Sequence, residues 1–166
     1  GGAPKGSFFN RFAPPANPAN TGLIMHAGKF LALNEGGRPY EVDPATLGTE
    51  GEFTYGDSLS KTNVFSAHGK INPHTGFYYN FGLCFDVSLK GLKPGFEFYK
   101  IDPKGQMVDR AIFELDFIPL LHDFALTENY AIFIQSSVSL HGNLFMTMLK
   151  NKSMADLMKF DKNLTN

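Results

Sequence analysis

Two of the five histidines lie within apolar stretches, where an imidazole needs a partner. His68 follows Phe65-Ser66-Ala67, and His122 lies between Pro119-Leu120-Leu121 and Asp123-Phe124. A buried imidazole is either hydrogen-bonded inside the core or a metal ligand. The other three histidines, which we expect to be exposed in turns or loops, are His26, His74 and His141.

The separation of His68 and His122 supports the metal interpretation. They are 54 positions apart (122 minus 68), about the length of one four-stranded unit with ordinary strands and loops. Equivalent positions in neighbouring units of a ring point toward one axis. Histidines repeated at this interval would therefore converge on a central ion, and imidazole suits iron, copper or zinc.

Glu35 is the candidate carboxylate. It follows the apolar run Leu31-Ala32-Leu33 and precedes Gly36-Gly37, so it is either a surface charge at a strand end or a carboxylate that points inward. An inward carboxylate would accept the second ring N–H of a ligand histidine and fix its tautomer and ring angle. Its negative charge would also balance a dication.

The elements that position these residues are predicted to be strands. Seventeen Phe, six Tyr, 17 Gly and 10 Pro with no Trp are typical of an all-β fold. We expect no helix before residue 145. The expected strands are Gly22–Met25, Lys29–Leu33, Val64–Ala67, Gly76–Val87, Gly95–Ile101, Gln106–Leu115, Leu121–Leu126 and Tyr130–Gln135. His26-Ala27-Gly28, between the first two, predicts a tight hairpin.

One turn chemistry recurs along the chain. An apolar residue precedes Asp-Pro or Asn-Pro at Val42-Asp43-Pro44, Ile71-Asn72-Pro73 and Ile101-Asp102-Pro103. Asp or Asn accepts a local backbone hydrogen bond, and proline sets φ at the next turn position. An all-β sandwich could contain the same turns, but their repetition favours repeated units such as propeller blades.

Three segments differ in composition. Residues 1–20 hold four of the ten prolines and predict an irregular connection, and residues 21–145 hold the strands. Residues 146–166 predict the start of a helical lobe, because Ser153-Met154-Ala155-Asp156 resembles a capping box. The expected apolar face of this short helix is Met154, Leu157 and Met158.

Charge and hydropathy exclude several classes of protein. Fifteen basic and sixteen acidic residues give a net charge of -1, and without a basic cluster we expect no nucleic-acid partner. Every apolar run falls short of the roughly 18 residues of a membrane helix. The single cysteine, Cys84, and the lack of a secretory signal pattern predict a reducing, cytoplasmic location.

Three stretches resemble the carotenoid cleavage oxygenase family. They are Asn20–Gly37, Phe65–Gly76 and His122–Tyr130, the last reading His-Asp-Phe-Ala-Leu-Thr-Glu-Asn-Tyr, and the resemblance covers roughly residues 6–145. It implies a seven-bladed β-propeller, of which this chain would form about two to three blades. The family's non-haem iron(II), Fe(2+), lies on the axis, held by four histidines with outer-shell glutamates.

The resemblance also implies a role for each candidate residue. His68 is similar to the first iron ligand, His122 to the second and Glu35 to the first outer-shell carboxylate. The other two histidines and further glutamates would lie C-terminal to this chain. We therefore expect an internal fragment that is inactive alone.

The implied reaction is a dioxygenase reaction, in which O2 cleaves a conjugated carbon–carbon double bond to two carbonyl products. The expected substrate is an apolar carotenoid or apocarotenoid in a tunnel beside the iron, and no side chain acts as a conventional acid or base. Phe81–Phe85 would line such a tunnel or, as for most phenylalanines, pack between blades.

Two alternatives stay open. A stilbene-type double bond is a possible substrate at the same iron site. A metal-free, propeller-like binding module would keep both histidines as core residues, and a reading frame extended past Asn166 would then show no further histidines at blade-scale intervals. Peripheral membrane contact of the full-length enzyme is also left open.

Overall fold

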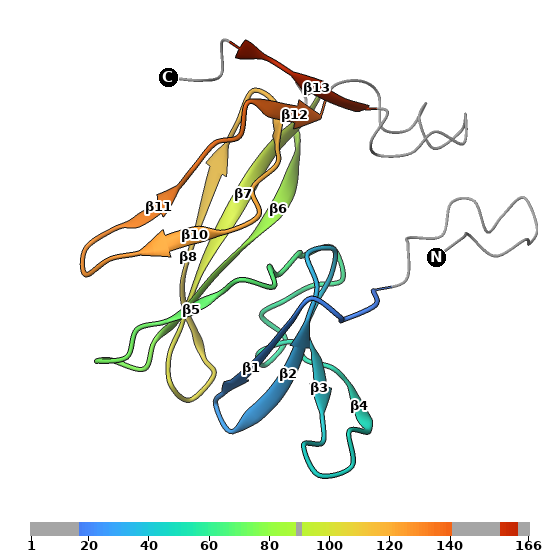
Figure 1. The fold of residues 1–166 in the computed structure, drawn as a ribbon, viewed down its shortest axis with the longest axis vertical. Helices are drawn as coiled ribbons and strands as arrows, with labels where there is room; N and C mark the ends of the chain where they lie inside the picture. Colours follow the sequence, from blue (N-terminus) through green and yellow to red (C-terminus); the bar gives the residue numbers. More distant parts are fainter. Residues whose placement is uncertain (1–16, 89–90, 141–156, 163–166) are drawn as a thin grey trace, which may run out of the picture.

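The computed structural model describes residues 17–88, 91–140 and 157–162, and these residues form an all-β structure of antiparallel sheets (Figure 1). The predicted fold class is therefore confirmed, while the number of blades stays a prediction. Within these ranges there is no helix with the length and hydropathy needed to cross a membrane.

The first four strands form one sheet in sequence order. A two-residue turn, Ala27-Gly28, joins the first pair, and both residues have positive φ, 53° and 72°. This is the pattern of a type I′ hairpin, whose twist matches that of the flanking strands, and it confirms the predicted tight hairpin. The strands are β1 (Gly22–His26), β2 (Lys29–Leu33), β3 (Tyr40–Val42) and β4 (Thr49–Glu52).

The next four strands form a second antiparallel sheet, also in sequence order. Its long central pair runs in register from Tyr78 opposite Ile101 to Ser88 opposite Gly91. The strands are β5 (Lys70–Ile71), β6 (Tyr78–Ser88), β7 (Gly91–Ile101) and β8 (Met107–Glu114).

The repeated Asp/Asn-Pro turns form as predicted. In each, the side-chain Oδ1 of the first residue accepts two backbone N–H groups further along the turn. The pairs are Asp43 with Ala45 and Thr46, Asn72 with His74 and Thr75, and Asp102 with Lys104 and Gln106.

The remaining strands are short. A hairpin of β10 (Phe124–Leu126) and β11 (Ala131–Phe133) lies beside the second sheet in Figure 1. A three-stranded sheet has the order β13 (Met158–Phe160), β12 (Val138–Leu140) and β9 (Ile118–Pro119).

Two sequence predictions of local structure are wrong. Met158 lies in β13, where its residue pairs with Leu140, rather than in a helix; Ser153 and Met154 lie outside the described residues. The expected strand Val64–Ala67 is an irregular segment. Val64 lies against Gly82 of β6, where a Cβ would overlap the Val64 carbonyl. The next two residues bond to different elements, since Phe65 N–H donates to the Gly37 carbonyl and Ser66 N–H to the Phe81 carbonyl of β6.

The second sheet is covered on both faces, because successive side chains of a strand point to opposite sides. On one side, Tyr78, Tyr99 and Ile101 pack against Leu31 and Leu33 of the first sheet. On the other, Phe81 and Phe98 pack against the β10–β11 hairpin. The ring centroids there are 5.1 to 5.9 Å apart among Phe81, Phe98, Phe124 and Phe133.

Candidate metal centre

Glu35, His68 and His122 meet at one point of the structure. Glu35 follows β2, His68 lies just before β5 and His122 lies just before β10. One ligand atom from each lies within 4.8 Å of the others, and the two imidazole centroids are 4.4 Å apart. The structure thus brings together all three residues that the sequence singled out. Within the described ranges no second cluster of this kind occurs.

The Glu35 carboxylate contacts both histidines. Its Oε1 forms an ion-pair contact with Nδ1 of His122 and lies 3.7 Å from Nε2 of His68. The second distance is too long for a hydrogen bond. Nε2 of His68 is accordingly buried without a hydrogen-bond partner among the described residues, which is the condition of a nitrogen left for a ligand.

The three side chains differ in exposure. The exposed fractions are 29% for His68, 67% for His122 and 43% for Glu35. The expectation that both histidines are embedded among strand residues is therefore wrong for His122, and the Glu35 side chain is exposed. β10 begins at Phe124, so Phe124 occupies the buried position and His122 stays in the loop before it.

The His68 segment is threaded closely between the two sheets. A Cβ at Gly22 would lie 2.6 Å from the Ala67 carbonyl oxygen, and a Cβ at Gly82 would overlap the Val64 carbonyl. A Cβ at Gly69 would overlap the Tyr78 hydroxyl. The absence of a side chain at these three glycines therefore lets the segment around His68 pack this closely.

An ion pair joins the two histidine-bearing segments. Lys70, two residues after His68, places Nζ 2.7 Å from Oδ1 of Asp123, which follows His122. Partial burial raises the pKa of Asp123, but the bonds from Lys70 and from the Phe124 amide outweigh it and hold this pKa below its usual range. Lys70 was not among the residues predicted from the sequence, where its only signal is its place two residues after His68.

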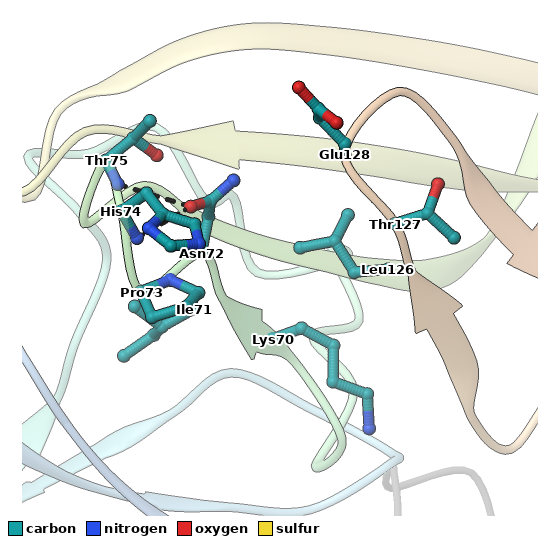
Figure 2. A pocket seen from close by; sticks show the side chains of 9 residues that line it. All are labelled: Lys70, Ile71, Asn72, Pro73, His74, Thr75, Leu126, Thr127 and Glu128. Atoms are coloured by element: carbon teal, nitrogen blue, oxygen red, sulfur yellow. Dashed lines mark hydrogen bonds between the residues drawn. The ribbon is translucent and has the colours of Figure 1, made fainter.

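A pocket of about 740 Å³ lies beside this ion pair, between the turn after β5 and the turn after β10 (Figure 2). Lys70 lines it, with Asn72–Thr75 on one side and Leu126–Glu128 on the other. β5 and β10 also belong to different sheets. Their relative placement, and with it that of His68 and His122, therefore depends on side-chain contacts.

The remaining histidines lie elsewhere or outside the described residues. His26 is only 6% exposed, which corrects the expected exposure; its hairpin docks onto the second sheet, with the His26 ring 5.0 Å from that of Tyr78. Burial lowers the pKa of His26, and the Gly76 backbone and the Asp102 charge offset part of this shift. His74 is exposed as expected, and His141 lies outside the described residues.

The chain matches the family model described as retinal pigment epithelial membrane protein (RPE65) over residues 3–166. It therefore belongs to this family, that of the carotenoid cleavage oxygenases. The resemblance drawn from the sequence motifs is confirmed.

Two relatives within the family are about 40% identical to this chain. The chain is 40% identical to lignostilbene-alpha,beta-dioxygenase isozyme III of Sphingomonas paucimobilis, over 69% of this chain and 23% of that protein. It is 42% identical to isoeugenol monooxygenase of Pseudomonas nitroreducens, over the same shares, 69% and 23%. The chain thus spans about a quarter of the length of these curated relatives.

A solved structure shows the same fold. Cobalt-substituted apocarotenoid oxygenase of Synechocystis superposes with a TM-score of 0.75 at 28% identity, covering 95% of this chain and 33% of that one. The likeness covers 95% of the chain, so the described sheets have the propeller-type fold of that enzyme.

Proposed function

We propose that this protein is part of a non-haem iron oxygenase that uses O2 to cleave a conjugated carbon–carbon double bond of an apolar substrate. Each carbon of the broken double bond would gain one oxygen atom of O2, which gives two carbonyl products. The observation that carries the proposal is the convergence of two imidazoles and one carboxylate from three separate loops. The family membership and the named relatives support it.

The residues present fit iron. Nε2 of His68 is buried and unpartnered among the described residues, and imidazole nitrogen is a suitable iron ligand. The contact of Glu35 with His122 keeps the proton on Nδ1, which leaves the opposite ring nitrogen unprotonated and able to bind a metal. His68 and His122 would therefore hold the ion, and Glu35 would act as the outer-shell carboxylate.

Iron(II) bound there would supply the redox chemistry that activates O2. The chain itself supplies position and charge. Two neutral imidazoles leave the charge of a dication uncompensated, and the Glu35 carboxylate provides negative charge close by. Phe81 is 3% exposed inside the aromatic cluster, so we assign it to packing rather than to a substrate tunnel.

For the substrate, we place a stilbene-type aryl alkene first. The relatives at 40% and 42% identity are named for lignostilbene and isoeugenol, whereas the apocarotenoid-15,15'-oxygenase of Synechocystis is 33% identical. A carotenoid or apocarotenoid is the second candidate, since the same iron site would serve both.

The test uses the full-length protein loaded with Fe(II) in air, with a hydroxystilbene, isoeugenol and an apocarotenoid as separate substrates. Mass spectrometry should detect aldehyde products, with the highest kcat/KM on the stilbene. His68→Ala and His122→Ala should each lower iron affinity by about 100-fold. His74→Ala is the matched control, because His74 is exposed and lies outside the cluster.

Two outcomes would overturn the proposal. Wild-type protein that binds no iron would return the chain to the metal-free binding module. Unchanged iron content in both His68→Ala and His122→Ala would place the metal elsewhere.

A further inference from the structure

Asn80 is a buried polar residue on the face of β6 that packs against the first sheet. It is fully inaccessible, 0% exposed. Its Nδ2 donates to the Ser66 carbonyl at 2.8 Å and to the Tyr78 hydroxyl at 2.9 Å, and its Oδ1 accepts the Phe81 N–H at 2.6 Å. A primary amide offers two donors and an acceptor at once, so no apolar side chain could replace these bonds.

From Asn80 the hydrogen bonds lead through Ser66 to His68. The Ser66 N–H donates to the Phe81 carbonyl at 2.7 Å, and its carbonyl accepts from Asn80. Its Oγ accepts the backbone N–H of His68 at 3.1 Å. Ser66 is 3% exposed, so water cannot easily substitute for these partners.

The His68 ring depends on this backbone. Its Nε2 has no hydrogen-bond partner among the described residues, because the Glu35 carboxylate lies 3.7 Å away, too far for a hydrogen bond. The orientation of His68 must therefore be set largely by the segment from which it projects.

We infer that Asn80 is a positioning residue for His68, acting through Ser66. The inference rests on the proposed metal site. Asn80 is not proposed to touch the ion or the substrate. It donates a hydrogen bond to the Ser66 carbonyl, and the Ser66 hydroxyl accepts the backbone N–H of His68.

The experiment compares five variants of the full-length protein. Asn80→Leu removes the amide at similar volume, and Asn80→Asp removes its donors and adds a negative charge. Ser66→Ala removes only the hydroxyl, while Ser66→Thr keeps it. The matched control is Tyr99→Phe, because the Tyr99 hydroxyl donates to the Val64 carbonyl at 3.1 Å, in the same segment but further from His68.

Three measurements separate positioning from stability. Hydrogen exchange of the His68 amide in metal-free protein should accelerate about fivefold in Ser66→Ala and in both Asn80 variants. Co(II) affinity should fall about 10-fold in the same variants, with an altered visible absorption spectrum of the bound ion. Tyr99→Phe should lower the melting temperature but leave both other readouts unchanged, and Ser66→Thr should behave as wild type.

Each contrary outcome is informative. If Ser66→Ala and the Asn80 variants lose only stability, as Tyr99→Phe does, Asn80 is structural and the inference is wrong. Tighter Co(II) binding in Asn80→Asp would show that charge rather than position matters, which also overturns it. If wild-type protein binds no Co(II) while the exchange effect persists, the positioning of His68 stands and the proposed iron site fails.

Discussion

His68 and His122 lie with ring centroids 4.4 Å apart, yet the chain holds them by different means. The His68 segment passes between two sheets, where glycines clear its path and buried hydrogen bonds fix its backbone. His122 is 67% exposed in a loop. That loop is held by the Phe124 ring next to it and by the ion pair between Lys70 and Asp123.

This difference shows which kind of change each half of the site should tolerate. On the His68 side, backbone clearance and buried hydrogen bonds are decisive, so one added methyl group should be harmful. On the His122 side, packing and charge are decisive, so the size of a side chain should matter more than backbone space.

The largest effect is expected from Phe124→Ala, on the His122 side. Phe124 is 5% exposed and contacts Phe81, Phe98 and Phe133, so its loss should lower the free energy of unfolding by about 4 kcal/mol. Denaturant unfolding measures this. The control is Phe113→Ala, which removes a ring that is 47% exposed; an equal loss in both variants would mean that Phe124 does not anchor the His122 loop.

Gly82→Ala tests the His68 side. Its Cβ would overlap the Val64 carbonyl, and because backbone must shift, we expect a loss of about 3 kcal/mol. Gly28→Ala meets no atom within 4 Å but must adopt φ of +72°, so it should cost roughly 1–2 kcal/mol. The idea of a closely threaded segment fails if Gly82→Ala is the milder change in chemical denaturation.

Much of the local structure and the three site residues could be predicted from the sequence, but the path of the His68 segment could not. The β1–β2 hairpin, the Asp43, Asn72 and Asp102 turns and the three site residues follow from local chemistry, spacing and a motif. The path of Val64–Ala67 does not, because it depends on the absence of a side chain at Gly82 in another element.

Other misses have the same origin in tertiary structure. Local chemistry places His26 at a hairpin, but only the docking of that hairpin on Tyr78 buries it. Met158 has helical spacing with its neighbours, yet pairing with β12 places it in a strand. His122 is flanked by apolar residues, but only the start of β10 at Phe124 decides which residue is buried.

Glu35→Gln addresses the group that lies between the two halves. The amide keeps the shape and one acceptor oxygen but loses the charge, so iron occupancy at limiting Fe(II) should fall by about 10-fold. The fold should survive, because no cavity opens. Elemental analysis of the full-length protein measures the effect, with Glu128→Gln as the control at an exposed carboxylate; unchanged iron content would make Glu35 a surface charge.

A smaller, pH-dependent effect is expected on the His68 side. Burial lowers the pKa of His26 in the folded state, so the unfolded chain binds the proton first as the pH falls below about 6.5. The unfolded state then holds more protons, and the free energy of unfolding should decrease with falling pH. His26→Phe should reduce this slope in denaturant titrations between about pH 7.5 and pH 5, and the exposed His74→Phe should not. Identical slopes in the two variants would contradict a buried, neutral His26.

The smallest effect is expected from the ion pair on the His122 side. Lys70 and Asp123 are 34% and 48% exposed, so their coupling should contribute only about 0.2–1 kcal/mol to the free energy of unfolding.

The effect of the ion pair on Fe(II) affinity distinguishes two explanations, because they predict opposite changes for one of the variants. Charge alone predicts that Lys70→Met, which removes a positive charge, strengthens Fe(II) binding and that Asp123→Asn weakens it. If the ion pair instead places the two histidine segments, both changes should weaken Fe(II) binding, by about two- to fivefold.

We expect both changes to weaken binding, because β5 and β10 share no sheet and a pocket lies between their turns. Fe(II) titrations of the two single variants and the double variant measure it. Tighter binding by Lys70→Met would show that the His122 loop is placed without the ion pair, and the aromatic anchor at Phe124 would then be sufficient.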